Sequence, residues 1–200
     1  CLDVDEFRTC PAKWRKIDGA KGISALHALD QTPASAHRRS SVATFLDIAE
    51  SLRRSFAATP QAKILGLDPC DFGTNAGRGR CQKCLGLGTT DDGDPCAVCG
   101  GLRFGIDVLS VRLNESNLAE ILATPIADFE ERTPSGMSEK LVRRLVELGI
   151  GHLSLGRSLD TLSGGEIQRL RVARALSRHR TQHAFFVIDQ PARGFPPPDV

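Results

Sequence analysis

The sequence predicts an α/β fold: a partial parallel or mixed sheet with helices that carries a small inserted cysteine-rich module. Short apolar runs at 23–29 and 184–188 are typical of buried strands. Apolar residues at helical spacing lie between the two runs. At 71–105 glycine is frequent, apolar periodicity is lost and two close pairs of cysteines occur. We therefore expect a separate module there.

The first predicted strand, 23–29, ends before a polar loop that contains Gln31. From residue 44 an amphipathic helix is predicted, with Arg53 and Arg54 opposite its apolar face. That face repeats at helical spacing through Phe45, Ile48, Leu52 and Phe56.

After the cysteine-rich module, residues 106–113 alternate in hydrophobicity and predict a strand. Asn117 and Glu120 form a capping-box pattern at the start of a helix. Another helix is predicted to begin near Ser138 and to stop at Gly149. We expect these elements to serve packing.

The C-terminal part predicts a glycine-led helix followed by a continuous apolar strand, 184–188. Continuous apolarity predicts burial on both faces, as in a parallel sheet. The strand runs into Asp189, and α/β sheets bind ligands at the carboxyl ends of their strands. No internal repeat is evident in the sequence.

Composition indicates a folded protein: AVILMFWYC residues make up 40% of the 200 residues. The net charge of +2 means that a nucleic-acid partner has to be held by a local basic patch. No run approaches the ~20 apolar residues of a membrane span. We expect a cytoplasmic protein without a membrane partner, and the initial Cys1 suggests part of a larger protein.

Two CxxC pairs predict a structural zinc site. Cys81 and Cys84 form the first pair, Cys96 and Cys99 the second, and eleven residues separate the pairs. Four thiolates complete the tetrahedron that Zn²⁺ prefers and leave no open position for catalysis. The less favoured alternative is four reduced cysteines that share a loop by chance. Glycines at 86, 88, 100 and 101 would let the backbone turn tightly around the metal. The three other cysteines, Cys1, Cys10 and Cys70, are expected to be inert thiols.

Four basic residues surround this module: Arg78, Arg80, Lys83 and Arg103. Such a group can contact DNA phosphates without sequence preference. A solvated charged rim explains the same residues equally well. Both interpretations stay open at this point.

A second candidate site is the start of the C-terminal helix, which comprises Leu162, Ser163, Gly164, Gly165 and Glu166. Backbone N–H groups and the helix dipole suit a phosphate there, although simple helix capping is the more frequent role of such a sequence. The downstream strand would deliver Asp189 to Mg²⁺, as in phosphate-binding NTPases. Together with Gln31, this set resembles that of the ATP-binding cassette (ABC) ATPases.

A zinc module lies between the loop glutamine and LSGGE, which narrows the resemblance within that superfamily. The chain resembles the C-terminal nucleotide-binding half of the UvrA family, the damage-recognition ATPases of the bacterial excinuclease. The resemblance spans about residues 20–200 and covers a minor part of a full-length member. It is carried by LDQTP (29–33), RSSVATF (39–45), FGTNAGRGRCQKCLGLG (72–88), PCAVCGGLRF (95–104), LGRSLDTLSGGEIQRLRVARALS (155–177) and FFVIDQPARG (185–194).

The resemblance implies an ATP-dependent protein that recognises DNA damage in nucleotide excision repair. Ser163, Gly164 and Gly165 would contact the γ-phosphate of ATP held by a second nucleotide-binding half, Gln31 would sense that phosphate, and Asp189 would help to hold Mg²⁺. The implied partners are damaged double-stranded DNA, a second half or a homodimer partner, and the excinuclease protein UvrB.

The resemblance also implies four segments. Residues 1–70 would be a partial nucleotide-binding domain with the glutamine loop, and 71–105 the zinc-binding module. Residues 106–140 would form a strand and helical connector. Residues 141–200 would hold the ABC signature helix and the Walker B strand.

The chain departs from the family pattern at several points. Gln190 stands where a glutamate would polarise the attacking water, and an amide cannot accept a proton as a carboxylate can. No GxxxxGK[ST] phosphate loop occurs in the 200 residues, so this chain alone is not expected to bind ATP tightly. The connection between the cysteine pairs is also short, which suggests a DNA-facing tip that is cut back.

Other function classes remain. One is a non-catalytic pseudo-ATPase in which Gln190 traps ATP. Another is a zinc-hairpin binding module of the DnaJ type, since CQKCLGLG is similar to CxxCxGxG, although that class has no use for LSGGE. A transporter ATPase ranks last, because such cassettes carry no four-cysteine insertion.

Overall fold

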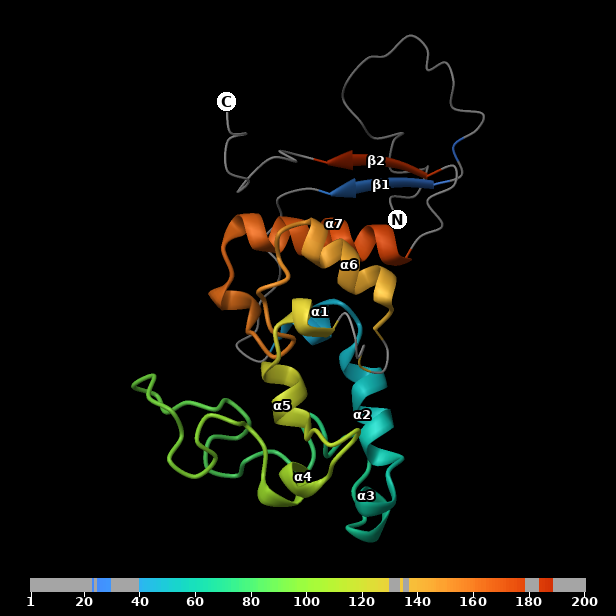
Figure 1. Ribbon diagram of the computed structural model, residues 1–200. Coiled ribbons are helices and arrows are strands. Elements are labelled where there is room, and N and C mark those ends of the chain that lie inside the picture. Colours follow the sequence, from blue (N-terminus) through green and yellow to red (C-terminus); the bar gives the residue numbers. More distant parts are fainter. Residues whose placement is uncertain are drawn as a thin grey trace, which may run out of the picture. The chain divides into compact units, whose positions relative to one another are not determined.

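The computed structural model describes residues 23, 25–29, 40–129, 134, 137–178 and 184–188 (Figure 1). The chain divides into two compact units, one made of residues 1–33 and 163–200 and the other of residues 34–162. Gln31, Asp189 and Gln190 lie outside the described residues. The division into four segments stays a prediction.

The described residues of the first unit form two strands and one helix. Strand β1 (Ala25–Leu29) pairs in parallel with β2 (Ala184–Ile188), with Ala25 opposite Ala184 and Leu29 opposite Ile188. Helix α7 (Gly164–Arg178) contacts β1. Both strands and the glycine-led helix form where the sequence predicts them.

The prediction that β2 is buried on both faces is wrong within the described part of the chain. Phe185 and Val187 are 52% and 49% exposed. Side chains alternate along a strand, so both belong to the same face, which the described residues leave open. On the other face, Phe186 packs against the buried His27 of β1, with ring centroids 5.0 Å apart.

The second unit is helical over its described residues. Its elements are α1 (Val42–Phe45), α2 (Ala49–Ala57), α3 (Pro60–Ile64), α4 (Ile106–Ser110), α5 (Leu118–Ala123) and α6 (Glu139–Glu147), with the short 3₁₀ helices η3 (Ile126–Phe129) and η4 (Leu159–Thr161).

The single helix predicted from residue 44 is broken into α1 and α2. Asp47 adopts φ 62° between them, a left-handed conformation that ends α1. The predicted apolar face holds beyond the break, because Ile48, Leu52 and Phe56 are buried. Hydrophobic spacing thus identified the buried face but not the interruption.

The strand predicted at 106–113 is wrong, because residues 106–110 form α4. Gly105 adopts the extended conformation of a helix N-cap. Val108 and Val111 are fully buried and lie three residues apart, while Ile106 is exposed. Over so short a segment, an alternating pattern of apolar residues is also compatible with helical spacing.

The ends of α5 and α6 follow their predicted signals. Asn117 and Glu120 bond each other's backbone N–H groups at 2.9 and 2.8 Å, which completes the capping box of α5. Ser138 caps α6, and Gly149 follows it with φ +70°. Local capping chemistry therefore fixes both helices where the sequence predicts.

An apolar core joins α2–α5 to the base of the cysteine-rich module. Phe56 of α2 packs on Phe72, with ring centroids 5.6 Å apart, and Phe104 belongs to the same core. The remaining buried members are Ala62, Leu67, Val108, Val111, Leu118 and Ala119. Both ends of the module, at Phe72 and Phe104, are thus anchored in the helical part.

Residues 153–157, which we call the strap, tie several helices together through backbone hydrogen bonds. The strap bonds the start of α1, the end of α5 and the start of η3. The bonds run from Val42 N–H to Arg157 O (3.0 Å), Ala43 N–H to Leu155 O (2.8 Å), Gly156 N–H to Leu122 O (2.7 Å) and Ile126 N–H to Leu153 O (2.9 Å).

Among the described residues, no helix combines the length and the apolar character needed to cross a membrane.

Candidate functional site

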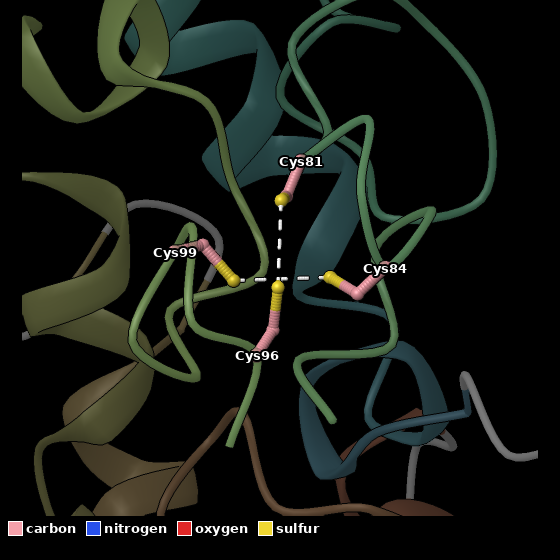
Figure 2. Close-up of side chains that lie close together, drawn as sticks. All are labelled: Cys81, Cys84, Cys96 and Cys99. Atoms are coloured by element: carbon pink, nitrogen blue, oxygen red, sulfur yellow. Dashed lines mark hydrogen bonds between the residues drawn. The ribbon is translucent and has the colours of Figure 1, made fainter. Parts of the chain in front are cut away.

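Four cysteine sulfurs converge in the module, as the spacing predicts (Figure 2). All lie within 4.8 Å of one another, and all four side chains are buried. The Sγ–Sγ distances are 4.0 Å for Cys81 and Cys96, and 3.8 Å for Cys84 and Cys99. Four sulfurs at ~2.3 Å from one Zn²⁺ define a tetrahedron with edges of about 3.8 Å, so the donor set fits zinc.

The cluster is built from two matching turns, 81–88 and 96–103, which corrects the expectation that the sequence holds no internal repeat. Each turn has the sequence pattern CxxCxGLx. In the first turn, Gly88 N–H bonds Cys84 Sγ (3.2 Å), and in the second, Arg103 N–H bonds Cys99 Sγ (3.4 Å). The turns also pair reciprocally, through Cys81 N–H to Arg103 O and Cys96 N–H to Gly88 O, both 2.9 Å.

Two glycines of the first turn are required by their surroundings. Gly86 has φ +80°, and a Cβ there would overlap the carbonyl oxygen of Thr74. Gly88 has φ +85°, and a Cβ there would lie 2.9 Å from both Gly101 O and Arg103 Cγ. The glycines predicted at these turns therefore serve conformation and close packing together.

The protein environment shifts the pKa values of two of the thiols in opposite directions. The backbone N–H groups of Cys99 and Val98 lower the pKa of the Cys96 thiol, because they stabilise its thiolate. Burial raises the pKa of the Cys99 thiol and outweighs the N–H groups of Arg103 and Gly101. A cation at the centre would favour the thiolate at both positions.

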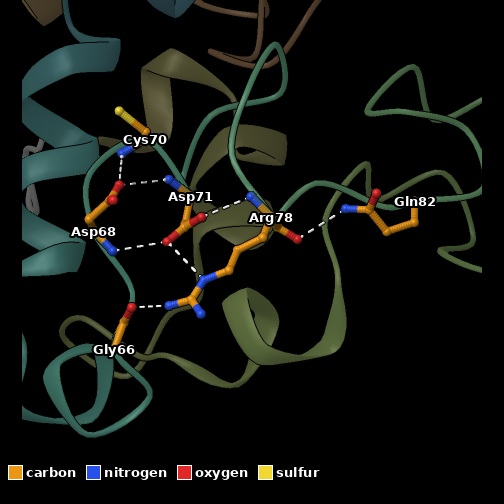
Figure 3. Close-up of polar contacts among 6 residues, drawn as sticks. All are labelled: Gly66, Asp68, Cys70, Asp71, Arg78 and Gln82. Carbon is orange, nitrogen blue, oxygen red and sulfur yellow. Dashed lines mark hydrogen bonds and ion pairs between the residues drawn. The ribbon is translucent and has the colours of Figure 1, made fainter.

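A buried carboxylate, Asp71, organises the loop that precedes the cluster (Figure 3). It accepts hydrogen bonds from the N–H groups of Asp68 (3.0 Å) and Arg78 (2.9 Å), and from Arg78 Nε (3.4 Å). The Arg78 guanidinium also donates to the carbonyl of Gly66. Asp71 is a residue that our sequence reasoning missed, although the pattern Asp68-Pro-Cys-Asp71 is typical of a side-chain-capped turn.

The surroundings of Asp71 lower the pKa of its carboxyl group. Burial raises the pKa of this carboxyl, but the N–H groups of Asp68 and Arg78 and the Arg78 guanidinium lower it more. The net pKa lies below its ordinary value. The carboxylate form therefore stabilises this loop.

The four predicted rim residues differ in their surroundings. Arg80 Nη1 donates to Asn75 O (2.9 Å), and Arg103 Nε donates to Gly86 O (3.0 Å). With Arg78 on Gly66, three guanidinium groups hold loop carbonyls. Lys83 is exposed on the first turn. A role of these residues in DNA binding stays a prediction.

The predicted signature residues lie at the start of α7. The N–H group of Ser163 donates to Glu166 Oε2 (2.7 Å), and the N–H group of Glu166 donates to Ser163 Oγ (3.3 Å), which forms a capping box. Ser163 and Gly164 are exposed, Gly165 is buried, and Leu162 precedes them as a buried residue. Because Gln31, Asp189 and Gln190 lie outside the described residues, their proximity to Ser163 stays a prediction.

Comparison with known proteins finds strong similarity to one kind of protein, although no family model matches the chain. UvrABC system protein A of Lactococcus lactis is 34% identical over 95% of this chain, and that of Thermus thermophilus is 33% identical over 96%. The crystal structure of UvrA2 from Deinococcus radiodurans superposes on 87% of the chain, with a TM-score of 0.75 and 33% identity.

The shared region is a small part of each of these proteins. The chain covers 21% of the Lactococcus and Thermus sequences and 22% of the UvrA2 chain. What the chain matches is thus a segment of UvrABC system protein A, about a fifth of its length.

Replacing Asp71 with Asn tests the carboxylate-centred loop. The substitution turns one acceptor oxygen into a donor that faces N–H groups, so we expect the free energy of unfolding at pH 7 to fall by about 1–3 kcal/mol. Because the native pKa of Asp71 is lowered, its contribution is present at neutral pH and is lost as the pH falls through that pKa. Urea unfolding at pH 7 and at pH 3 measures both effects.

The matched control is Asp92→Asn, because Asp92 is exposed in the connection between the turns. We expect this variant to stay within about 0.5 kcal/mol of the parent. Equal stability of the two variants at pH 7 would contradict the role assigned to Asp71.

Proposed function

We propose, from its likeness to a segment of UvrABC system protein A, that the chain is the zinc-containing part of an ABC-type ATPase that recognises DNA damage in nucleotide excision repair. The observation that carries this proposal is similarity along 95% of the chain, combined with a four-cysteine cluster whose sulfurs converge. In this proposal, the chain contributes one of the two halves of a composite ATP site.

We propose that the four thiolates hold one structural Zn²⁺. The sulfur spacing supports zinc, and four protein ligands complete its coordination shell. Zinc supplies the positive charge that offsets four neighbouring thiolates. The chain's own part is to bury the sulfurs and to direct the N–H groups of Gly88 and Arg103 at two of them.

We further propose that Ser163, Gly164 and Gly165 face the γ-phosphate of ATP bound by a second nucleotide-binding half. The first turn of α7 leaves backbone N–H groups without intrahelical acceptors, and the positive end of the helix dipole favours an anion. The exposure of Ser163 and Gly164 supports this role. In the proposal, Gln31 senses this phosphate and Asp189 helps to hold Mg²⁺.

DNA and protein partners follow from the same proposal. Lys83 would contact phosphates of damaged double-stranded DNA from the zinc module. The second nucleotide-binding half would come from the same polypeptide or from a homodimer, and the excinuclease protein UvrB would act on the DNA complex.

Gln190 favours a second candidate function, a non-catalytic ATP-binding protein of the same type. An amide at the position of the expected glutamate cannot take a proton from the attacking water. Such a protein would bind ATP and hold its ATP-bound state without turnover.

Zinc content tests the metal site. We expect about one zinc per chain by elemental analysis of the reduced protein, because four thiolates complete one coordination shell. Cys84→Ser removes one ligand and should lose most of the bound zinc. Cys70→Ser is the control: Cys70 is exposed and lies outside the cluster, so its zinc content should equal that of the parent. Zinc well below one per chain in the parent would contradict the site.

DNA binding tests the proposed activity. The natural-length protein should bind a duplex with one bulky adduct more tightly than the same duplex undamaged. Lys83→Ala should weaken binding to both by about fivefold and lower the slope of log K against log salt by about one, as expected for one lost phosphate contact. Fluorescence anisotropy across a salt series measures these changes.

The control for this experiment is Lys63→Ala, which removes an exposed lysine from α3. It should bind both duplexes as the parent does. Equal binding of damaged and undamaged DNA would contradict damage recognition. Unchanged binding by Lys83→Ala would contradict only the phosphate contact assigned to Lys83.

Gln190→Glu separates the two candidate functions. In the natural-length protein, restoring a carboxylate should raise ATP turnover by about 10²–10⁴-fold, the usual effect of a general base. Gln61→Glu, on the surface of α3, is the matched control and should leave turnover unchanged. Failure of Gln190→Glu to raise turnover would mean that the loss of activity has causes beyond this position.

A further inference from the structure

Arg103 occupies a position where the matching turn has glycine. The two turns are offset by fifteen residues, so Arg103 corresponds to Gly88. Both adopt left-handed backbone, with φ +75° for Arg103 and +85° for Gly88. Glycine takes this conformation without strain, whereas arginine does not. A residue that adopts a strained backbone conformation points to a role of its side chain.

The side chain of Arg103 reaches from the cluster to the strap. Its Nε donates to the carbonyl of Gly86 in the first turn, and its Nη1 lies 3.5 Å from the carbonyl oxygen of Gly156 in the strap. The backbone of Arg103 bonds Cys99 Sγ through its N–H group and accepts from Cys81 N–H. One residue therefore contacts both cysteine turns and the strap.

Gly156 is held firmly at the other end of this contact. Its N–H group donates to Leu122 O at 2.7 Å, and a Cβ on Gly156 would lie 2.9 Å from that same oxygen. On either side, the carbonyls of Leu155 and Arg157 accept from the N–H groups that start α1. The carbonyl that receives Arg103 thus belongs to the segment that joins α1, α5 and η3.

We propose that Arg103 is a positioning residue through which metal binding at the four-cysteine cluster orders the strap. The bonds to Cys99 and Cys81 fix the backbone of Arg103, so loss of the metal loosens this turn and withdraws the guanidinium from Gly156. This inference rests on the proposed metal site alone, and it holds whether or not DNA or ATP is bound.

Hydrogen–deuterium exchange of the natural-length protein tests the inference. Removing zinc with a chelator should raise the exchange rate of Gly156 N–H at least about tenfold, since the strap loses a hydrogen bond from a charged group. In zinc-loaded Arg103→Gly, the same amide should already exchange at the rate of the metal-free parent, and chelation should add nothing. Glycine accepts the backbone conformation at 103, so this variant should retain zinc.

Two further variants sharpen the test. Arg103→Lys keeps the charge, but one ammonium cannot span the carbonyls of both Gly86 and Gly156, so its zinc-loaded strap should also exchange fast. Lys63→Ala removes an exposed cation from α3, outside the cysteine turns and the strap, and should behave as the parent in both metal states.

The outcomes separate this inference from the metal site. Wild-type protection of Gly156 in zinc-loaded Arg103→Gly or Arg103→Lys would overturn the inference. So would a zinc-loaded parent whose strap does not respond to chelation. A parent that binds no zinc would overturn the inference and the metal site together, and zinc content measured on the same samples distinguishes these cases.

Discussion

The convergence of four sulfurs on one point is the constraint on which the module depends. Residues 66–105 contain no helix or strand, so they lack the repeated backbone bonds that hold a segment in shape elsewhere. Four thiolates within 4.8 Å repel one another unless a cation lies between them. In the proposed zinc-bound state, the ion that removes this repulsion would also link the two turns, so coordination chemistry would fix the shape of the loop.

The module is not an isolated appendage, because different forces attach it to the helices at different levels. Phe72 and Phe104 place its two ends in the apolar core. At the start of the module, Asp71 gathers the backbone of Asp68 and Arg78 through charge-assisted hydrogen bonds, which are stronger than neutral ones. Arg103 then adds a polar contact to the strap. The cysteine cluster, the carboxylate and the core each organise a separate part of the loop.

Sequence patterns predicted the features that depend on local chemistry. They failed where contacts with distant segments decide the secondary structure. Cysteine spacing predicted the cluster, and the Asn117 capping box predicted the start of α5, because each signal lies within a few residues. The break at Asp47 and the helix at 106–110 were not predicted, since a short apolar pattern fits two periods and the surrounding core selects one. The exposed face of β2 was not predicted for a similar reason, because a run of apolar residues does not show which segments pack on each face of a strand.

The short separation between the cysteine pairs also bears on the order in which the polypeptide folds as it is synthesised. All four ligands emerge from the ribosome soon after Cys99 has been made, and closing so small a loop costs little entropy. Strand β1, in contrast, must wait for β2, which is translated much later. If the four thiolates hold zinc as proposed, metal binding would give the nascent chain a formed nucleus while its sheet is still incomplete, and zinc shortage would impair folding already during synthesis.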